Sequence, residues 1–350
     1  MNKLLKWPLI FLGSLAVIFV VANVVSVIES RFWVKAKDCN ATAFEIAGPA
    51  SPVWQNSRGW AFDGDHLWIM AANASQVIKV NPATGATAGV VMLPSKPVDL
   101  SFDGTHIWVS SERYYYVIDI ISSVFVELPA ADEKGRQLKS AVGNLIFDGQ
   151  YFWSGTFGVS RICRDTGEFL AWNISGGAGT VGIYDGQFLW GISQSGLLQV
   201  DPSAGSVVAE HALDIGGPLY YDGDAIWGIV VEGGVPNEYG GIHYTDDNFT
   251  TFLVKTNISQ PAFPYISAKY ELGAVRIKDI TFAGGLTWLI SDTGKVITFD
   301  PLSRQITESR QVFNRMMGDF SLVTDGIIVF ALDYSSGTLV SLADWPAFVR

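Results

Sequence analysis

A sequence unit of about 43 residues recurs through most of this 350-residue chain, and no other feature limits the fold as strongly. Two clear copies are Trp60-Ala-Phe-Asp-Gly-Asp-His-Leu-Trp-Ile and Leu100-Ser-Phe-Asp-Gly-Thr-His-Ile-Trp-Val. The repeated dipeptide starts at Asp63, Asp103, Asp148, Asp185, Asp222, Ala283 (Ala-Gly in place of Asp-Gly) and Asp325. Successive offsets are 40, 45, 37, 37, 61 and 42 residues, so the chain holds seven units, one with an insertion. A fixed period of this length is typical of solenoids and propellers.

Each unit predicts four short antiparallel strands. An apolar run leads into Asp-Gly, a dipeptide suited to the left-handed conformations of a tight hairpin turn. A second apolar run holds the tryptophan, and a third ends in another turn, which is Asn81-Pro-Ala-Thr-Gly85 in the first unit. A fourth run, 88–93 in that unit, closes the repeat. Four strands every 40-odd residues predict an all-β, seven-bladed β-propeller with four-stranded blades, with six or eight blades as alternatives.

The last unit lacks a fourth strand because the chain ends soon after residues 338–342. The segment Ala41-Thr-Ala-Phe-Glu-Ile-Ala-Gly-Pro is similar to Ala86-Thr-Ala-Gly-Val-Val-Met-Leu-Pro, which contains the fourth strand of the first unit. We therefore expect residues 42–47 to complete the seventh blade and close the ring, which removes an open sheet edge. The predicted propeller spans residues 42–350.

The N-terminus differs in composition from the repeat. Residues 1–6 are short and basic, and residues 7–28 contain no charged side chain. At 1.5 Å per residue an apolar helix of this length spans roughly 30 Å, the thickness of a bilayer core. The apolar run exceeds that of a cleaved signal peptide, and no small-x-small site follows it. We predict a transmembrane signal anchor over 7–28 and a tether over 29–41, with a cleaved signal as the alternative. The anchor's position favours an extracytoplasmic propeller, periplasmic or extracellular.

Charge and aromatic content exclude several classes of protein. The chain has 23 Lys and Arg against 34 Asp and Glu, a net charge of −11, so no basic field is available for a nucleic acid. Twelve tryptophans and 16% charged residues exclude a disordered chain. Six tryptophans stand at one repeated position, where we expect them to pack between blades, and the Asp-Gly aspartates are expected to build turns: Trp68, Trp108, Trp153, Trp190, Trp227 and Trp288.

The repeat also resembles a known group of proteins. The pair of strands around Phe-Asp-Gly-x-x-Leu-Trp-Val, followed by Val-x-x-Val-Asp-Pro-x-Thr-Gly, resembles the streptogramin-lyase-like and lactonase-like seven-bladed propellers, a superfamily similar to the quinoprotein propellers. The resemblance covers residues 42–342 and implies the fold. Lyases of this group would call for a catalytic histidine with acidic partners and a metal. His211 and His243 are the histidines outside the Asp-Gly turns, and no catalytic motif matches residue by residue.

Interruptions of the repeat are the predicted binding regions, because repeat proteins tolerate insertions at loops on the binding face. The fifth unit inserts residues 232–247, the connection 130–143 is long, and residues 110–116 combine charge with tyrosines. The candidate residues on the binding face are Glu112, Arg113, Arg136, Glu232, Tyr239, His243, Asp246 and Arg315.

Polar residues near the ring centre form a second candidate site. Four residues before the repeated dipeptide stand Asp99, Asn144 and Asp279, whose oxygens suit Ca²⁺ or another divalent cation. A water-filled channel lined with polar groups is the alternative. No cofactor beyond such a cation is predicted.

Two functions follow from these observations. The favoured one is a non-enzymatic binding or scaffold module, held to the membrane by its N-terminal helix and bound to protein partners in a membrane or cell-surface complex. The alternative is a metal-dependent extracytoplasmic hydrolase or lyase using His243, Glu232, Asp279 and Asp99. Cys39 and Cys163 fall on opposite sides of the predicted ring, which disfavours a disulfide between them and leaves free or partner-linked thiols open.

Overall fold

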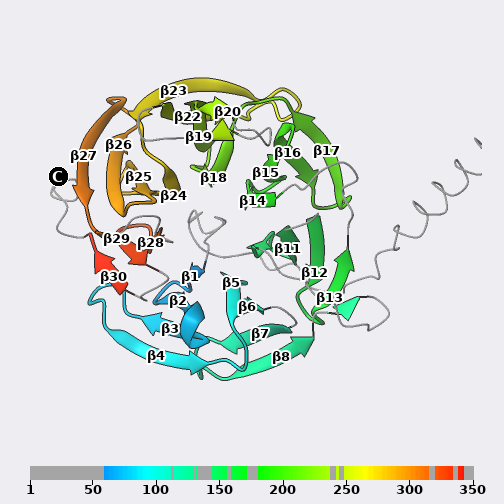
Figure 1. The fold of residues 1–350 in the computed structure, drawn as a ribbon. Coiled ribbons are helices and arrows are strands. Elements are labelled where there is room, and N and C mark those ends of the chain that lie inside the picture. Colours follow the sequence, from blue (N-terminus) through cyan, green and yellow to red (C-terminus); the bar gives the residue numbers. More distant parts are fainter. Residues whose placement is uncertain are drawn as a thin grey trace, which may run out of the picture.

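The computed structural model describes residues 59–111, 114–129, 131–132, 144–155, 159–171, 180–236, 242–243, 248–314, 320–333 and 338–342. These residues form seven antiparallel sheets arranged around a common axis (Figure 1). The seven-bladed, all-β architecture predicted from the repeat is confirmed. In the described part of the chain, five blades have four antiparallel strands each, blade three has a fifth strand that pairs in parallel, and the seventh has three strands.

The strands of blades one to three are β1 (Trp60–Phe62), β2 (Leu67–Ala71), β3 (Gln76–Val80) and β4 (Thr87–Met92); β5 (Pro97–Phe102), β6 (His106–Ser111), β7 (Tyr114–Asp119) and β8 (Phe125–Pro129); and β9 (Ala131–Asp132), β10 (Ile146–Phe147), β11 (Tyr151–Gly155), β12 (Val159–Cys163) and β13 (Glu168–Ala171). A single 3-10 turn, η1 (Ala72–Ala74), joins β2 to β3.

The strands of blades four to seven are β14 (Thr180–Tyr184), β15 (Leu189–Ser193), β16 (Gly196–Asp201) and β17 (Ser206–His211); β18 (Gly216–Tyr221), β19 (Ala225–Gly233), β22 (Phe249–Asn257) and β23 (Tyr265–Gly273); β24 (Ile277–Ala283), β25 (Leu286–Ser291), β26 (Lys295–Asp300) and β27 (Gln305–Gln311); and β28 (Phe320–Thr324), β29 (Val329–Asp333) and β30 (Thr338–Ser341). A small hairpin, β20 (Val235–Pro236) with β21 (Ile242–His243), lies in the insertion of blade five.

The N-terminal predictions fall outside the described residues. These are the anchor over 7–28, the tether over 29–41 and the closing strand over 42–47. Within the part of the chain that the structure describes, no helix has the length and apolarity needed to cross a membrane.

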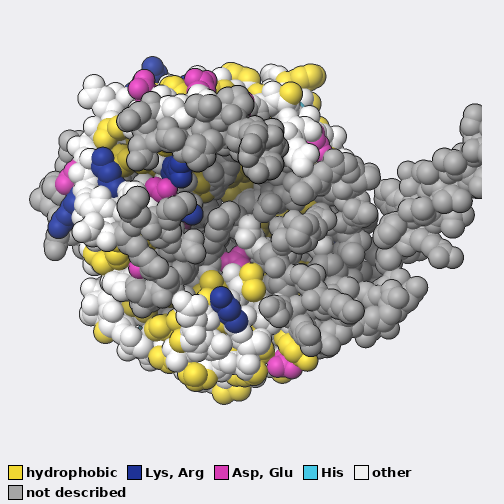
Figure 2. Space-filling view, viewed as in Figure 1, with side chains coloured by type: hydrophobic (Ala, Val, Ile, Leu, Met, Phe, Trp, Pro, Cys, Tyr) yellow, Lys and Arg dark blue, Asp and Glu magenta, His cyan; other side chains and the backbone are white. Residues whose placement is uncertain are grey.

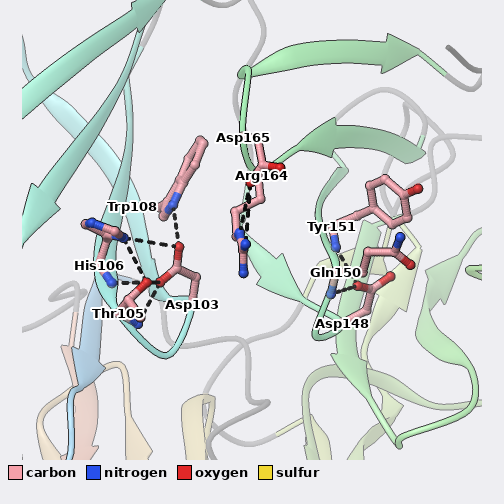
Figure 3. Close-up of polar contacts among 9 residues, drawn as sticks. All are labelled: Asp103, Thr105, His106, Trp108, Asp148, Gln150, Tyr151, Arg164 and Asp165. Carbon is pink, nitrogen blue, oxygen red and sulfur yellow. Dashed lines mark hydrogen bonds and ion pairs between the residues drawn. The ribbon is translucent and has the colours of Figure 1, made fainter. Parts of the chain in front are cut away.

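In every blade except blade six, one aspartate organises the turn between the first two strands. In blade two, Oδ1 of Asp103 accepts the backbone N–H of Thr105 at 2.8 Å and that of His106 at 2.6 Å (Figure 3). Its Oδ2 accepts the indole N–H of Trp108 at 3.0 Å. The intervening Gly104 has a φ of 93°, the left-handed region that glycine adopts without strain. Both oxygens of the carboxylate are therefore engaged within the blade, which supports the expected turn role.

The same bond from indole to carboxylate recurs in blades one, three, four and five. Its length is 2.7 Å for Trp68 and Trp153, and 2.6 Å for Trp190 and Trp227. Burying a polar group is costly unless it is hydrogen-bonded, and each of these side chains is almost wholly buried. The bond lets a large aromatic group enter the core with its N–H satisfied.

The buried tryptophans pack against the next blade around the ring. Trp68 of blade one lies in a cluster with Leu100 and Ile107 of blade two, and Trp190 of blade four lies in a cluster with Ile226 of blade five. The pattern continues through all seven interfaces, and the last one joins Phe330 of blade seven to Leu67 and Ile69 of blade one. The ring is thus closed by packing of the described residues, and the predicted role of the tryptophans is confirmed.

Blades six and seven have degenerate repeats, each of which lacks one partner of the bond from indole to carboxylate. In blade six, Ala283 stands in place of the aspartate, and its backbone carbonyl accepts the indole N–H of Trp288 at 3.1 Å. In blade seven, Phe330 replaces the tryptophan and has no N–H to satisfy, while Asp325 still accepts the N–H groups of Ile327 and Ile328. Loss of one partner is therefore matched by a change in the other.

Two blades depart from the regular pattern. In blade three, β9 pairs in parallel with the outer strand β13 and adds a fifth strand, so the connection from blade two first runs along the outside of blade three. In blade five, β19, β22 and β23 are nine residues each, longer than the strands of the other blades. The pairs formed by Val231, Glu232 and Gly233 continue the β19–β22 hairpin beyond the usual blade edge.

Replacing Asp103 by Asn tests the turn. The amide keeps an oxygen for the two backbone N–H groups but sets an N–H₂ against the Trp108 indole, so Asp103→Asn should lower the free energy of unfolding by about 1–3 kcal/mol. Asp325→Asn is the matched control, because Asp325 makes the same backbone bonds in a blade with no tryptophan. Urea unfolding of both variants measures the difference. Equal losses would show that the indole bond contributes nothing.

Candidate functional site

Asp99, the first candidate cation ligand, joins three blades near the central axis. It lies in β5 of blade two with its side chain 1% exposed. Its Oδ1 accepts the N–H of Gly59, just before β1, at 2.7 Å, and its Oδ2 accepts the N–H of Leu145, just before β10, at 2.8 Å. Hydrogen bonds to a carboxylate are stronger than neutral ones. The geometry therefore assigns Asp99 a structural task, holding the inner strands of blades one and three to blade two.

Asp279 occupies the matching position in β24 of blade six. Its Oδ2 accepts the N–H of Leu322 from blade seven at 2.9 Å and also the hydroxyl of Ser321. Its Oδ1 accepts the N–H of its neighbour Ile280 at 2.8 Å, whereas Oδ1 of Asp99 accepts a backbone N–H of the preceding blade. The reason lies in the sequence, since blade five has Pro218 at this position and proline has no N–H.

The candidate cation site is therefore built from groups that already have partners. Asp99 and Asp279 accept backbone N–H groups, and Asn144 lies half-buried immediately before Leu145. Among the residues the structure describes, no group of three or more His, Cys, Asp or Glu side chains is arranged to hold a metal ion. The polar-channel alternative accounts for these residues by hydrogen bonding alone.

The extended end of blade five contains the best-described candidate on the binding face. Glu232 lies at the exposed end of β19 and forms an ion pair with Lys269 of β23. The ammonium group of Lys269 also lies 4.0 Å from the ring centroid of Phe252, a cation–π contact. On the inner side, the guanidinium of Arg276 lies 5.6 Å from the ring of Phe249. Charged groups thus cover the aromatic side chains where the blade projects beyond its neighbours.

The remaining candidates are placed only in part. His243 lies in β21, and only its backbone is described. Six others fall outside the described residues and stay predictions: Glu112, Arg113, Arg136, Tyr239, Asp246 and Arg315. A hydrolase or lyase using Asp99, Glu232 and Asp279 would draw on three different blades, and each of those carboxylates already accepts protein hydrogen bonds.

The perturbed titratable groups belong to turns and to the packed blades. Burial raises the pKa of Asp148, although the N–H of Tyr151 and the indole of Trp153 partly oppose that rise. Burial lowers the pKa of His211, whose Nε2 lies 3.1 Å from Oε1 of Gln199 on the neighbouring strand. These shifts follow from the architecture of blades three and four, and neither group belongs to the candidate site.

Of the alternatives left open for the cysteines, a free thiol at Cys163 is excluded. Cys163, at the end of β12, is disulfide-bonded, and no cysteine is free in the described part of the chain. Sequence reasoning placed the two cysteines across the ring on the assumption that the segment after Cys39 joins blade seven.

Comparisons with known proteins identify the fold only. No family description matches the chain, and no curated protein matches its sequence. Hydrazine synthase of Kuenenia stuttgartiensis is similar over 85% of this chain and 97% of that chain, with a TM-score of 0.59 and 14% identity. The Cps50 (Swd1) β-propeller domain of Myceliophteria thermophila is similar over 81% of this chain and 96% of that chain, with a TM-score of 0.58 and 9% identity. The computationally designed protein Ika8 is similar over 82% of this chain and 96% of that chain, with a TM-score of 0.56 and 13% identity.

At these identities the likeness shows that the chain is a β-propeller and says nothing of what it binds. The finer resemblance to streptogramin-lyase-like propellers gains no support from the comparisons. Function must therefore be argued from the chain's own residues.

Asp99→Asn should destabilise the ring. The amide would direct its N–H₂ at the backbone N–H of either Gly59 or Leu145, leaving one buried donor without an acceptor, at a cost of about 1–3 kcal/mol. The exposed turn residue Asp65 provides the control, because Asp65→Asn changes the same charge at a solvated site. Urea unfolding compares the two. If the Asp99 variant were as stable as the control, the clamp between blades would be refuted.

Removal of divalent cations should leave the stability unchanged. The carboxylates at the ring centre accept backbone N–H groups, so a bound ion is not needed to hold them together. We expect equal Tm values for the purified protein with millimolar Ca²⁺ and with excess chelator. A ligand that binds only the folded state raises Tm. A reproducible Ca²⁺-dependent rise would therefore establish the cation site that the sequence suggested.

Proposed function

We propose that this protein is a membrane-anchored, extracytoplasmic propeller that binds protein partners as a subunit of a membrane or cell-surface complex. The uncharged run over residues 7–28 supports the anchor, because its length matches a bilayer core. The short tether over 29–41 would keep the propeller near the membrane. The confirmed part of this proposal is the propeller fold.

The observation that supports the binding role is that the polar residues of the repeat are already engaged within the propeller. The Asp-Gly aspartates, the repeat tryptophans and the carboxylates of Asp99 and Asp279 all bond within or between blades. Features beyond the repeat are concentrated in blade five, whose long hairpin extends past the neighbouring blades and carries the insertion. Loops displayed on a rigid scaffold are the usual place for binding residues.

Blade five also offers the surface chemistry of a protein contact. Among the described residues its outer strand β23 pairs with β22 alone, and it alternates exposed with partly buried side chains along nine residues. An exposed sheet edge can accept a strand of a partner, with affinity from backbone hydrogen bonds. On the face seen in Figure 2, the charged side chains of the described residues are scattered and do not form one basic field. That distribution suits a protein partner better than a nucleic acid.

A deletion within blade five tests the proposal. Gly233 and Phe249 are paired at the end of the β19–β22 hairpin, so residues 234–248 can be replaced by Asn-Gly, a two-residue hairpin turn. The full-length chain, purified from detergent-solubilised membranes, should bring a protein partner with it in fixed proportion, and the deletion should lose that partner while keeping its Tm.

The control is Asp65→Ser, which alters an exposed turn of blade one without touching the insertion. It should retain the partner. A wild-type chain that purifies with no protein above the level of a mock purification would contradict the binding role. Retention of the partner by the deletion would place the contact elsewhere on the propeller.

A further inference from the structure

Cys163 breaks the repeat at a position where the other blades agree. In blades one to six a second turn follows the third strand. One residue of the third strand pairs with the repeat tryptophan, and the turn begins at the residue two positions after it. In blades one, two, four, five and six this residue is Asn or Asp, and its side-chain oxygen accepts a backbone N–H two residues later: Asn81, Asp119, Asp201, Asn257 and Asp300. Blade three has Cys163 here, since Trp153 pairs with Arg161.

The shape of the turn does not explain the cysteine. The N–H of Gly167 donates to the carbonyl of Cys163 at 2.8 Å, the same length as the bond from Gly85 to Asn81 in blade one. Gly167 has a φ of 67°, close to the 68° of Gly85. A thiol is a much weaker acceptor than a carboxylate or amide oxygen. Blade three therefore keeps the turn while giving up its side-chain hydrogen bond, which indicates that the sulfur has another task.

That task is visible in the structure, because Cys163 is disulfide-bonded. Its side chain is only 3% exposed, so the bonded sulfur lies within the fold. The chain contains one other cysteine, Cys39. We propose that the bond joins Cys163 to Cys39 and fastens the tether to blade three. Cys39 itself lies outside the described residues.

The bond also determines which face of the propeller the tether meets. Cys163 pairs with Tyr151, which follows the Asp-Gly turn of blade three directly. Arg164 and Asp165, which form an ion pair, continue from Cys163 into the second turn (Figure 3). The tether is thus held on the face of the Asp-Gly turns, opposite the face of the blade-five insertion. Ten residues separate residue 28 from Cys39, a reach of about 40 Å from the membrane end.

A bond at Cys163 excludes the closing strand predicted over 42–47. Three residues after Cys39 the chain has moved at most about 10 Å. Blades three and seven are separated by two blades along one side of the ring and by three along the other (Figure 1). The segment therefore cannot reach the outer edge of blade seven while Cys39 is bonded to blade three.

Formation of the bond is an oxidation with a defined acceptor. The two thiols lose two protons and one electron pair as the sulfur–sulfur bond forms. The electron pair passes by thiol–disulfide exchange to the disulfide of an oxidoreductase, which becomes a dithiol. Such oxidants act in extracytoplasmic compartments. In this respect alone the inference rests on the location given in the proposed function.

Trapping of thiols in the full-length chain tests the pairing. Membranes are quenched with acid, denatured and alkylated, and the chain is digested without reductant and analysed by mass spectrometry. We expect one disulfide-linked peptide pair that contains Cys39 and Cys163, and no alkylation at either residue until reductant is added. A linkage of Cys163 to another chain would overturn the proposal.

Two variants separate the bond from the fold. Cys163→Asp restores the residue that three other blades use at this turn, so the propeller should fold, and Cys39 should change from unalkylated to fully alkylated. Cys39→Ser should expose Cys163 to the reagent after denaturation in the same way. If Cys39 stayed unalkylated in the Cys163→Asp variant, its partner would be another sulfur and the pairing would be wrong.

A redox buffer distinguishes failure of this inference from failure of the proposed location. The purified wild-type chain is equilibrated with reduced and oxidised glutathione before alkylation. Two alkylated cysteines under these conditions overturn the pairing. A linked peptide in the buffer, together with reduced thiols in cells, upholds the pairing and shows that the propeller does not reside in an oxidising compartment.

Discussion

The bond from indole to carboxylate couples the turn of each blade to the packing of the ring. One oxygen of the Asp-Gly aspartate holds the backbone of the turn, and the other accepts the N–H of the tryptophan five residues later. That tryptophan fills the interface with the next blade. A local feature of sequence therefore sets an interaction between units far apart in the chain. Because five blades repeat it, stability accumulates from neighbour to neighbour, as in other repeat proteins.

The Asp-Gly spacing allowed the fold to be predicted because a repeat supplies several independent copies of one signal. The fourth strand expected at 88–93 is observed as β4. The features that sequence reasoning missed occur once each. The pairing of β9 with β13 and the clamp of Asp99 to Gly59 and Leu145 depend on contacts between blades, which a single sequence does not reveal.

The candidate site was harder to predict for a related reason. Asp99, Asn144 and Asp279 were found by their shared position, and that position did bring Asp99 and Asp279 to the inner strands. Their chemistry was not readable from position, since the same oxygen that binds Ca²⁺ can accept a backbone N–H. Only the structure shows that Asp99 accepts the N–H of Gly59, whereas Pro218 at the equivalent position of blade five has no N–H to donate.

Departures from the repeat are informative once the structural need at each position is known. Ala283 loses a carboxylate, yet its backbone carbonyl takes over the same hydrogen bond, so the change is absorbed locally. Phe330 removes the donor itself, so the aspartate of its blade keeps only the turn. Cys163 differs from both. A sulfur stands where other blades have the side-chain oxygen that accepts a turn N–H, and this sulfur is disulfide-bonded. At Cys163 the departure from the repeat therefore changes the covalent bonding of the side chain rather than a hydrogen bond within the blade.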